Sequence, residues 1–426
     1  MIDLKQAVAA FLTLGMLAML INMMSNGPFL DADQASSEGK YSNGSELRER
    51  SPTVNRKTTR LKELWGRPGP VLEPCWDKHI TNLKGKTWGF IGVRLSNGPH
   101  YHRVQIADAV VVSKYLGATL LIPTIKDGHK EPNGQFDKIY DTSKFIASLQ
   151  NIVRVVGRIP DDMSSISPTV ISVPYRVTHD YIDEHIRPVF NQKTVIILDS
   201  FFPNINLKAK EGENIELEAL RCLVMYKAVQ FHSQLLKLGG RIVNRMREAG
   251  EMSEGRFIAV DLRVDLLQRK GCTNSTSEHD KSKTKKCVTA LEVGEFLKEL
   301  GFPTDTAIYL TQSRWDATLD PLREIFPNVY TKEYSMPFNE ERQILYSGKT
   351  QFEKALDFYI CSQSDIFVPA ISGMFYSTVA GQRISLGKTQ ILVPSSKHDT
   401  TSKIRLVDSL SRYVTKKDHS VYSCFC

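Results

Sequence analysis

The chain has 426 residues, of which 41% are hydrophobic and 9% aromatic, and its formal net charge is +8. These values are typical of a globular protein. Beyond an apolar N-terminal segment and a polar stretch, about 350 residues remain, which is too many for one ordinary core and suits two domains. The basic excess favours anionic small ligands or acidic glycans over nucleic acid, although a solvated basic surface explains it equally well.

The first predicted element is a membrane-spanning helix over residues 7–24, AVAAFLTLGMLAMLINMM. A helix of this length covers about 27 Å, enough to cross the hydrocarbon core of a bilayer. We expect an uncleaved anchor, because the apolar run is long for a signal peptide and is followed by a poor cleavage site. Lys5 before the helix and acidic residues after it place the tail, residues 1–6, in the cytosol and the rest of the chain in the lumen.

Two sequons and the cysteines agree with a lumenal body. Asn43 and Asn274 each begin an Asn-x-Ser/Thr triplet. Cys272 and Cys287 enclose a polar loop, and a disulfide between them would contribute about 3 kcal/mol in the chain-entropy model. The alternative is two free cysteines in a mobile loop.

The remaining cysteines have less certain partners. Cys222 lies in an apolar helical stretch and is predicted to be a buried small hydrophobe. Cys75 is a candidate partner for Cys424 or Cys426. Because the chain has seven cysteines, at least one is unpaired.

After a polar stem, residues 25–70, short apolar runs alternate with amphipathic stretches. In the first half we expect strands at 88–95, 118–123, 169–173 and 194–198, and helices at 104–116, 144–156, 215–238 and 241–249. In the second half we expect strands at 257–262, 306–310, 364–369 and 390–394, and helices at 290–300, 316–325, 351–362 and 375–381. This alternation predicts two parallel-sheet α/β domains, 71–240 and 241–426, divided near Gly239 and Gly240.

Ligands in open parallel sheets bind beyond the carboxyl ends of the strands, and two such ends carry suggestive residues. Arg263 follows the predicted strand FIAVDL, and its planar, permanently charged guanidinium suits phosphate. Ser372, as a predicted N-cap, and Gly373 open the helix after SDIFVP, where backbone N–H groups and the helix dipole attract an anion. Together they would clamp one diphosphate. The alternatives are a salt bridge between Arg263 and Asp265, and simple helix capping by Ser372.

Several familiar motifs are missing from the sequence. It has no Walker loop and no GxGxxG, which argues against nucleotide hydrolysis and dinucleotide redox chemistry. No zinc-ligand spacing occurs, and His100 and His102 are by default loop histidines. The one Asp-x-Asp triplet, Asp31 to Asp33, lies in the stem, where it cannot hold a catalytic metal.

At these residues the chain resembles the plant O-fucosyltransferase-like glycosyltransferases, in particular their mannan-synthesis-related branch. The resemblance is carried by MIDLKQAVAAFLTLGMLAML, SNGPHYHRVQIADAVVVSKYLGATLLIP, FDKIYDTSKFIASLQNIVRVV, RFIAVDLRVD, IYLTQSRWD, ALDFYICSQSDIFVPAISGMFY and YSCFC. It implies a single-pass type II Golgi membrane enzyme of the GT-B architecture, with two Rossmann-like domains facing across a cleft. It also implies inverting, metal-independent transfer from a nucleotide-sugar donor, with a GDP-sugar favoured, to a glycan or glycoprotein acceptor in cell-wall synthesis.

The resemblance also implies roles for single residues. Arg263 matches the arginine of the family's His-Leu-Arg motif and would hold the donor diphosphate, with Ser372 and Gly373 as phosphate contacts. Asp365 and Phe367 match an Asp-x-Phe motif near the nucleotide base.

The sequence departs from the family pattern in two places. The histidine of His-Leu-Arg is Asp261, and the glycine-rich Asn-Gln loop reads NGPHYHR from Asn97 and Gly98 onward. Both sites are where donor sugar and acceptor would meet, so a donor other than GDP-fucose, such as GDP-mannose, is an alternative. Asp261, His100 and His102 are the candidate catalytic bases. The rival function is a non-catalytic Golgi factor that supports a polysaccharide synthase.

Overall fold

The computed structural model describes one compact unit, which begins at Thr53. The described residues are 65–66, 69, 72–83, 85–127, 131–134, 136–161, 166–202, 214–269, 287–336, 342, 350–394 and 419–426. The predicted anchor at 7–24, the sequon residues Asn43 and Asn274, and Cys272 lie outside them. Among the described helices, none combines the length and apolar character that crossing a bilayer demands.

The first sheet is built around strand β1 (Phe90–Leu95), whose residues are almost all buried. On one side β1 pairs in parallel with β7 (Val195–Phe201), which in turn pairs with β6 (Thr169–Pro174). β2 (Thr119–Leu121) and β3 (Thr124–Asp127) pair in parallel with successive parts of β1. β5 (Val155–Val156) adds to β2, and β4 (Glu131–Gly134) is antiparallel to β3.

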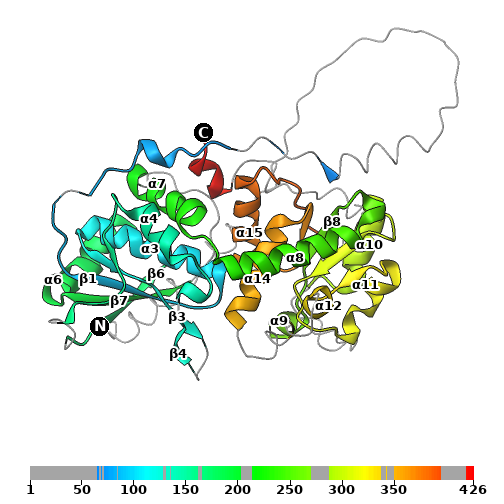
Figure 1. Ribbon diagram of the computed structural model, residues 1–426, viewed down its shortest axis with the longest axis horizontal. Helices are drawn as coiled ribbons and strands as arrows, with labels where there is room; N and C mark the ends of the chain where they lie inside the picture. Colours follow the sequence, from blue (N-terminus) through cyan, green and yellow to red (C-terminus); the bar gives the residue numbers. More distant parts are fainter. Residues whose placement is uncertain are drawn as a thin grey trace, which may run out of the picture. The chain divides into compact units, whose positions relative to one another are not determined.

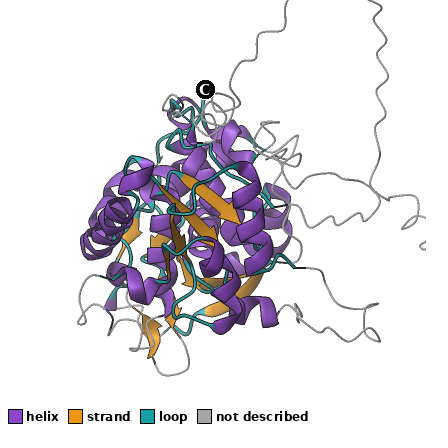
Figure 2. Cartoon of the chain, turned by 90° about the vertical axis from the view of Figure 1, so that its right-hand side faces the viewer, coloured by secondary structure: helices purple, strands orange, loops and turns teal. Residues whose placement is uncertain are grey.

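The second sheet has four parallel strands in the order β10-β9-β8-β11. They are β8 (Phe257–Asp261), β9 (Ala307–Leu310), β10 (Val329–Tyr330) and β11 (Ile366–Pro369). Alternate residues of β8 enter different cores: Phe257 and Ala259 face one hydrophobic cluster, and Ile258 and Val260 face the other. Burial on both faces is the pattern expected of a parallel sheet covered by helices, and Figure 2 shows the strands enclosed in this way.

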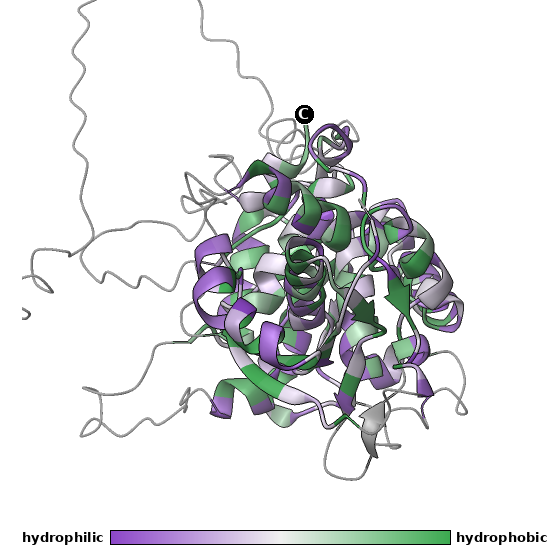
Figure 3. Ribbon diagram, turned by 90° about the vertical axis from the view of Figure 1, so that its left-hand side faces the viewer, coloured by the Kyte–Doolittle hydropathy of each residue, from purple (hydrophilic) through white to green (hydrophobic). Residues whose placement is uncertain are grey.

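Helices cover both sheets (Figure 1). They are α3 (Pro99–Leu116), α4 (Thr142–Leu149), α5 (His179–Tyr181), α6 (Arg187–Gln192), α7 (Ile215–Leu223), α8 (Ser233–Ala249), α9 (Val264–Arg269), α10 (Ala290–Leu300), α11 (Asp320–Ile325), α12 (Lys332–Ser335), α14 (Thr350–Gln363) and α15 (Met374–Ser385). Hydrophobic segments lie mainly in the interior in Figure 3, and hydrophilic ones mainly at its edge. The α/β fold with parallel sheets is therefore as predicted from the sequence.

Three predicted elements differ from the structure. The helix expected at 144–156 ends at Leu149, and its last two residues form β5. The helix expected at 215–238 is interrupted after a π-helical turn, Val224–Ala228. The chain then leaves the helix, and Phe231 forms a β-bridge with Tyr140. His232 caps the next helix, α8, by accepting a hydrogen bond from Gln234 N. The strand expected at 390–394 is a single bridge between Ile391 and Phe367.

The division predicted near Gly239 and Gly240 falls inside α8. Gly239 lets α14 approach, since a Cβ at this position would lie 2.4 Å from a ring atom of Tyr359. One hydrophobic cluster also runs from β1 through α8, α14 and α15 to β8 and β9. The two sheets therefore share part of their hydrophobic core.

Disulfides attach the C-terminal turn, Ser420–Cys424, to the first half of the chain. Cys75 bonds to Cys426, as the sequence allowed, and Cys222 bonds to Cys424. Cys222 is buried, as predicted, but it forms a disulfide and is not simply a small hydrophobic side chain. Cys361 is free and buried, and Cys287 is disulfide-bonded.

Candidate functional site

A cleft of about 870 Å³ lies where the carboxyl ends of β1, β8, β9 and β11 meet. We call it the central cleft. From the first half of the chain it is lined by Asn97, His100 and Tyr101. From the second half it is lined by Asp261, Arg263, Asp265, Leu266, Arg269, Thr311, Gln312, Ser313, Arg314, Lys332, Glu353, Lys354, Asp357, Ile371, Ser372, Gly373, Met374 and Phe375. The site thus forms at the edge where parallel sheets bind ligands.

Arg263 is held at the cleft wall by Asp261. Its Nε and Nη2 donate to Oδ1 and Oδ2 of Asp261 at 2.9 and 3.1 Å, and Thr311 Oγ1 also donates to Oδ1 at 2.9 Å. Burial alone would lower the pKa of Arg263, but the charge and hydrogen bonds of Asp261, together with Asp357 and Cys361, raise the pKa. The guanidinium also lies 4.9 Å from the centre of the Phe375 ring. The alternative pairing with Asp265 is wrong, because Asp265 pairs with Arg269.

Two helix N-termini open onto the same cleft. α15 begins after Gly373, whose φ of 142° is strained for other residues, and Gly373 rather than the predicted Ser372 is the N-cap residue. α3 begins after Gly98, with φ of 105°. Gly98 itself is not among the cleft-lining residues, while Asn97, Ser372 and Gly373 are. The positive dipole ends of both helices therefore favour negative charge in the cleft, although Pro99 of α3 lacks an N–H and the Tyr101 and His102 N–H groups donate to Gly98 O.

His100 lines the cleft as a neutral imidazole. Its side chain is 5% exposed and packs edge-to-face against Phe375 at 5.3 Å. Burial, followed by the charges of Arg263 and Lys354, holds its pKa well below 6.5. Its Nδ1 has no hydrogen-bond partner among the described residues. His100 therefore contributes a neutral ring to the cleft wall, and its unpartnered Nδ1 is buried.

His102 does not line the cleft. It is completely buried, its Nδ1 is 2.9 Å from the Tyr140 hydroxyl, and burial followed by the Lys354 charge lowers its pKa to about 3. As a catalytic base His102 is therefore a wrong prediction: one helical residue after Tyr101, it turns away from the cleft into the core.

Asp365 and Phe367 also lie away from the cleft. Asp365 is at the amino end of β11, where its Oδ2 accepts a hydrogen bond from Phe257 N at 3.1 Å and lies 3.6 Å from Arg247. Phe367 is fully buried in the middle of β11. Both therefore support the second sheet, and neither is among the residues that line the central cleft.

A charged cluster at the cleft was not predicted. Lys332 is 2% exposed, and its Nζ lies 2.7 Å from Asp357 Oδ2 and 3.7 Å from Glu353 Oε2. Ser313 donates to Glu353 at 2.8 Å, and Tyr309 donates to Asp357 at 2.8 Å. Burial, opposed by Lys332, raises the pKa of Asp357 to about 6. The available signal was the four-residue spacing of Glu353 and Asp357, which places both on one face of α14.

No group of three or more His, Cys, Asp or Glu side chains within the described residues is arranged to hold a metal ion.

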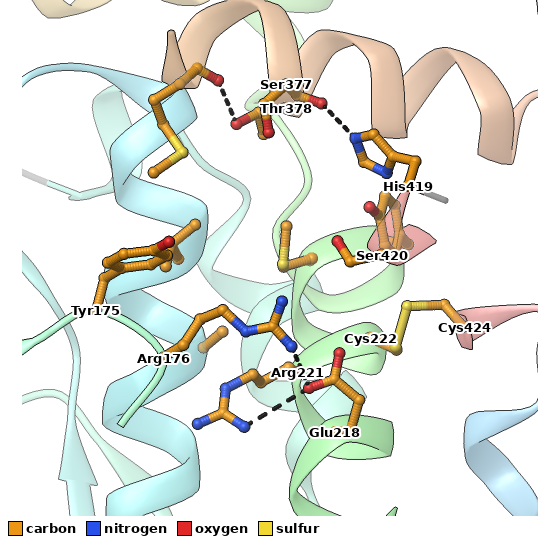
Figure 4. Close-up of a pocket in the computed structure, with 15 residues that line it drawn as sticks. Tyr175, Arg176, Glu218, Arg221, Cys222, Ser377, Thr378, His419, Ser420 and Cys424 are labelled. Carbon is orange, nitrogen blue, oxygen red and sulfur yellow. Dashed lines mark hydrogen bonds and ion pairs between the residues drawn. A yellow bond between two sulfur atoms is a disulfide. The ribbon is translucent and has the colours of Figure 1, made fainter. Parts of the chain in front are cut away.

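A second, smaller pocket lies between α3, α7, α15 and the C-terminal turn (Figure 4). Glu218 is 2.9 Å from Arg176 and 3.7 Å from Arg221 on its wall, beside the Cys222–Cys424 disulfide. The ring of His419 makes a 3.0 Å hydrogen bond with the Ser377 carbonyl of α15. These bonds join the C-terminal turn to the helix whose first residues line the central cleft.

Residues 90–386 match the family model of GDP-fucose protein O-fucosyltransferase. The chain belongs to this family. It is 41% identical to Protein MANNAN SYNTHESIS-RELATED 1 of Arabidopsis thaliana over 429 residues, which cover 100% of both chains. To O-fucosyltransferase 29 of the same plant it is 31% identical, over 72% of this chain and 60% of that one. The family resemblance seen in the sequence is thus confirmed.

Among solved structures, the fold is similar to a crystal structure of POFUT1 in complex with GDP, with a TM-score of 0.40 and 13% identity over 72% of this chain and 98% of that one.

Proposed function

We propose that this family member is a glycosyltransferase that binds a GDP-sugar in the central cleft and transfers the sugar to a hydroxyl group of a cell-wall glycan or glycoprotein. The observation that carries the proposal is the convergence of Arg263 and the N-terminus of α15 on one cleft, joined there by the N-terminus of α3. A diphosphate at this place would meet a guanidinium fork and the positive N-terminal ends of two helix dipoles.

In the proposed reaction these groups stabilise the departing diphosphate. The acceptor oxygen forms its bond to the anomeric carbon on the face opposite the diphosphate, so the configuration inverts. Charge that develops on the leaving group is met by the Arg263 guanidinium and the α15 N-terminus, and such preorganised electrostatic contacts are usually the largest contribution to catalysis. In this proposal the positive charge that stabilises the leaving group comes from the protein and not from a metal ion.

We place the reaction in the Golgi lumen, with residues 7–24 as the membrane anchor and Asn43 and Asn274 as glycosylation sites. The Cys75–Cys426 and Cys222–Cys424 disulfides support this placement, because disulfides persist in the oxidising secretory compartments. The kinship with proteins named for mannan synthesis supports a cell-wall glycan as the acceptor, and a polysaccharide synthase as a partner.

Donor binding by the full-length protein tests the proposal. Thermal unfolding is followed with GDP, GDP-fucose, GDP-mannose and a UDP-sugar, and a ligand at 100 times its Kd stabilises by about 2.7 kcal/mol. We expect GDP and at least one GDP-sugar to raise Tm, and Arg263→Ala to abolish the rise and to lower transfer about 100-fold or more. Full binding and transfer by Arg263→Ala would refute the assignment.

One observation favours a second function, a non-catalytic factor that supports a polysaccharide synthase. Asp261 occupies the position of the family histidine and takes two of the hydrogen bonds that Arg263 could otherwise give to a phosphate. Stabilisation by none of the nucleotides or nucleotide sugars, with the protein folded, would decide for the factor.

A further inference from the structure

A transferase of the proposed kind needs a group that accepts the proton of the attacking hydroxyl, and the candidates named from the sequence do not suit this role. Asp261 is fully buried, and its two carboxylate oxygens accept hydrogen bonds from Arg263 and Thr311. His102 lies outside the cleft, and His100 has a pKa well below its usual value, which makes it a weak base.

The other carboxylates of the central cleft differ in how many of their oxygens already have a hydrogen-bond or ion-pair partner. Asp357 accepts from Tyr309 with one oxygen and from Lys332 with the other. Asp265 is 62% exposed at the rim and pairs with Arg269.

Glu353 is the interior carboxylate with bonding capacity left. Its side chain is 12% exposed, and its Oε2 accepts from Ser313 Oγ at 2.8 Å and lies 3.7 Å from Lys332 Nζ. Among the described residues, no hydrogen bond to its Oε1 is present. The carboxylate is thus held through one oxygen while the other is available to a ligand.

The place of Glu353 in the fold suits a reaction between donor and acceptor. It lies one turn before Asp357 on α14, on the same helix face. The next residue, Lys354, packs against the start of α3, since a Cβ at Gly98 would lie 2.8 Å from its side chain. Glu353 therefore lines the cleft where α14 meets the first-half loop, in the same cavity as Arg263.

We propose that Glu353 is the general base of the transfer reaction, an inference that rests on the proposed function. The acceptor hydroxyl donates a hydrogen bond to Glu353 Oε1. As the hydroxyl oxygen bonds to the anomeric carbon, the hydroxyl proton moves to the Glu353 carboxylate. The bond from that carbon to the β-phosphate oxygen breaks, and its electron pair leaves with GDP. Ser313 and Lys332 are positioning residues that hold the carboxylate from its other side.

The test compares Glu353→Gln with Glu299→Gln, a matched loss of one carboxylate at an exposed position of α10 that does not line the central cleft. GDP binding is measured by calorimetry, and transfer from GDP-fucose and GDP-mannose is measured with manno-oligosaccharides and with water as acceptors. We expect GDP affinity close to wild type in both variants, transfer about 100-fold lower in Glu353→Gln, and near-normal transfer in Glu299→Gln.

A small anionic nucleophile separates a base from a merely structural residue. Azide attacks the anomeric carbon without losing a proton, so Glu353→Ala should form glycosyl azide and GDP in azide at a rate that exceeds its rate with water or sugar acceptors. Arg263→Ala should show no such rescue, because its defect lies in the leaving group.

The outcomes separate the two proposals. If the wild type transfers the sugar and Glu353→Gln transfers it at the same rate, the base assignment is overturned and the transferase function stands. Absence of azide rescue in a Glu353→Ala protein that still binds GDP also overturns it. GDP binding without product from the wild type removes the base and favours the non-catalytic factor, whereas failure of the wild type to bind GDP refutes the donor site itself.

Discussion

Arg263 and Asp261, two residues apart at the end of β8, form a two-point ion pair with N–O distances of 2.9 and 3.1 Å. The pair holds the guanidinium at the cleft wall, 4.9 Å from the centre of the Phe375 ring near the start of α15. Asp261 therefore sets both the direction and the net charge of the proposed phosphate site.

The first prediction concerns this pair. Asp261→Asn leaves the partly buried Arg263 without its counter-charge, and we expect a loss of about 3 kcal/mol in the free energy of unfolding. GDP should restore part of this loss, because its diphosphate supplies the missing negative charge. Thermal unfolding with and without GDP checks both effects. Asp265→Asn, which breaks an exposed pair, should cost less than about 1 kcal/mol. Equal Tm values for the two variants would contradict the prediction.

His102 predicts a pH dependence of stability. Its pKa is about 3 in the folded protein against an ordinary value of 6.5, so between these values the unfolded chain binds a proton that the folded protein does not. The free energy of unfolding therefore falls as pH falls from 6.5, by up to about 1.4 kcal/mol per pH unit. His102→Gln should make this slope shallower in urea unfolding between pH 4.5 and 7. Tyr140→Phe keeps the buried imidazole and should retain the wild-type slope.

Gly98 predicts a local effect on both stability and donor binding. Alanine there is strained by the φ of 105° and crowds Lys354 across the cleft, which we expect to cost about 1–3 kcal/mol. Gly85→Ala is the control, because Gly85 has a φ of 81° with no atom within 4 Å of the added Cβ. Weaker GDP binding should accompany Gly98→Ala alone. The same GDP affinity in both variants would show that the start of α3 does not serve the donor.

The Cys222–Cys424 disulfide predicts a dependence on reducing agent. Removing it with Cys424→Ser should lower the free energy of unfolding by about 2–5 kcal/mol, as is usual for a native disulfide. Dithiothreitol should also lower the Tm of the wild type, because it reduces the same bond. Cys361→Ser lacks only the free buried thiol, so dithiothreitol should lower the Tm of this variant as much as it lowers the Tm of the wild type. A variant Cys424→Ser with wild-type stability would contradict the prediction and would mean that the Cys75–Cys426 disulfide and the His419 contacts suffice to hold the turn.

Sequence patterns predicted most helices and strands, because helix capping and the burial of strands depend on residues that are close together in the sequence. The helix expected at 290–300 is α10 without change, since Thr289 and Glu292 form a capping box and Gly301 ends the helix in the left-handed conformation. The strands around FIAVDL and TAIYL were found because parallel strands buried on both faces read as apolar runs. The two apolar residues of β5 were assigned to a helix because so short a strand has no periodicity of its own.

Contacts distant in sequence were harder to predict. Arg263 and Ser372 were placed at the cleft because each follows a strand at its carboxyl end, and Asn97 was placed there by the family resemblance alone. Asp365 precedes its strand, so motif matching put it at the wrong edge of the sheet. Lys332 gave no signal at all, because burial of a lysine depends on carboxylates from another helix. The partner of Cys222 is 202 residues away, beyond any local pattern.

The attachment of the C-terminal turn has a consequence for biosynthesis. Cys222 and Cys75 are synthesised 202 and 351 residues before their partners, so on the ribosome both remain thiols until residues 424 and 426 have emerged. Cys361 emerges earlier and is a competing partner during that time. Correct pairing is thus a late event in synthesis, and a thiol–disulfide isomerase that resolves mispaired intermediates should accelerate maturation of the protein.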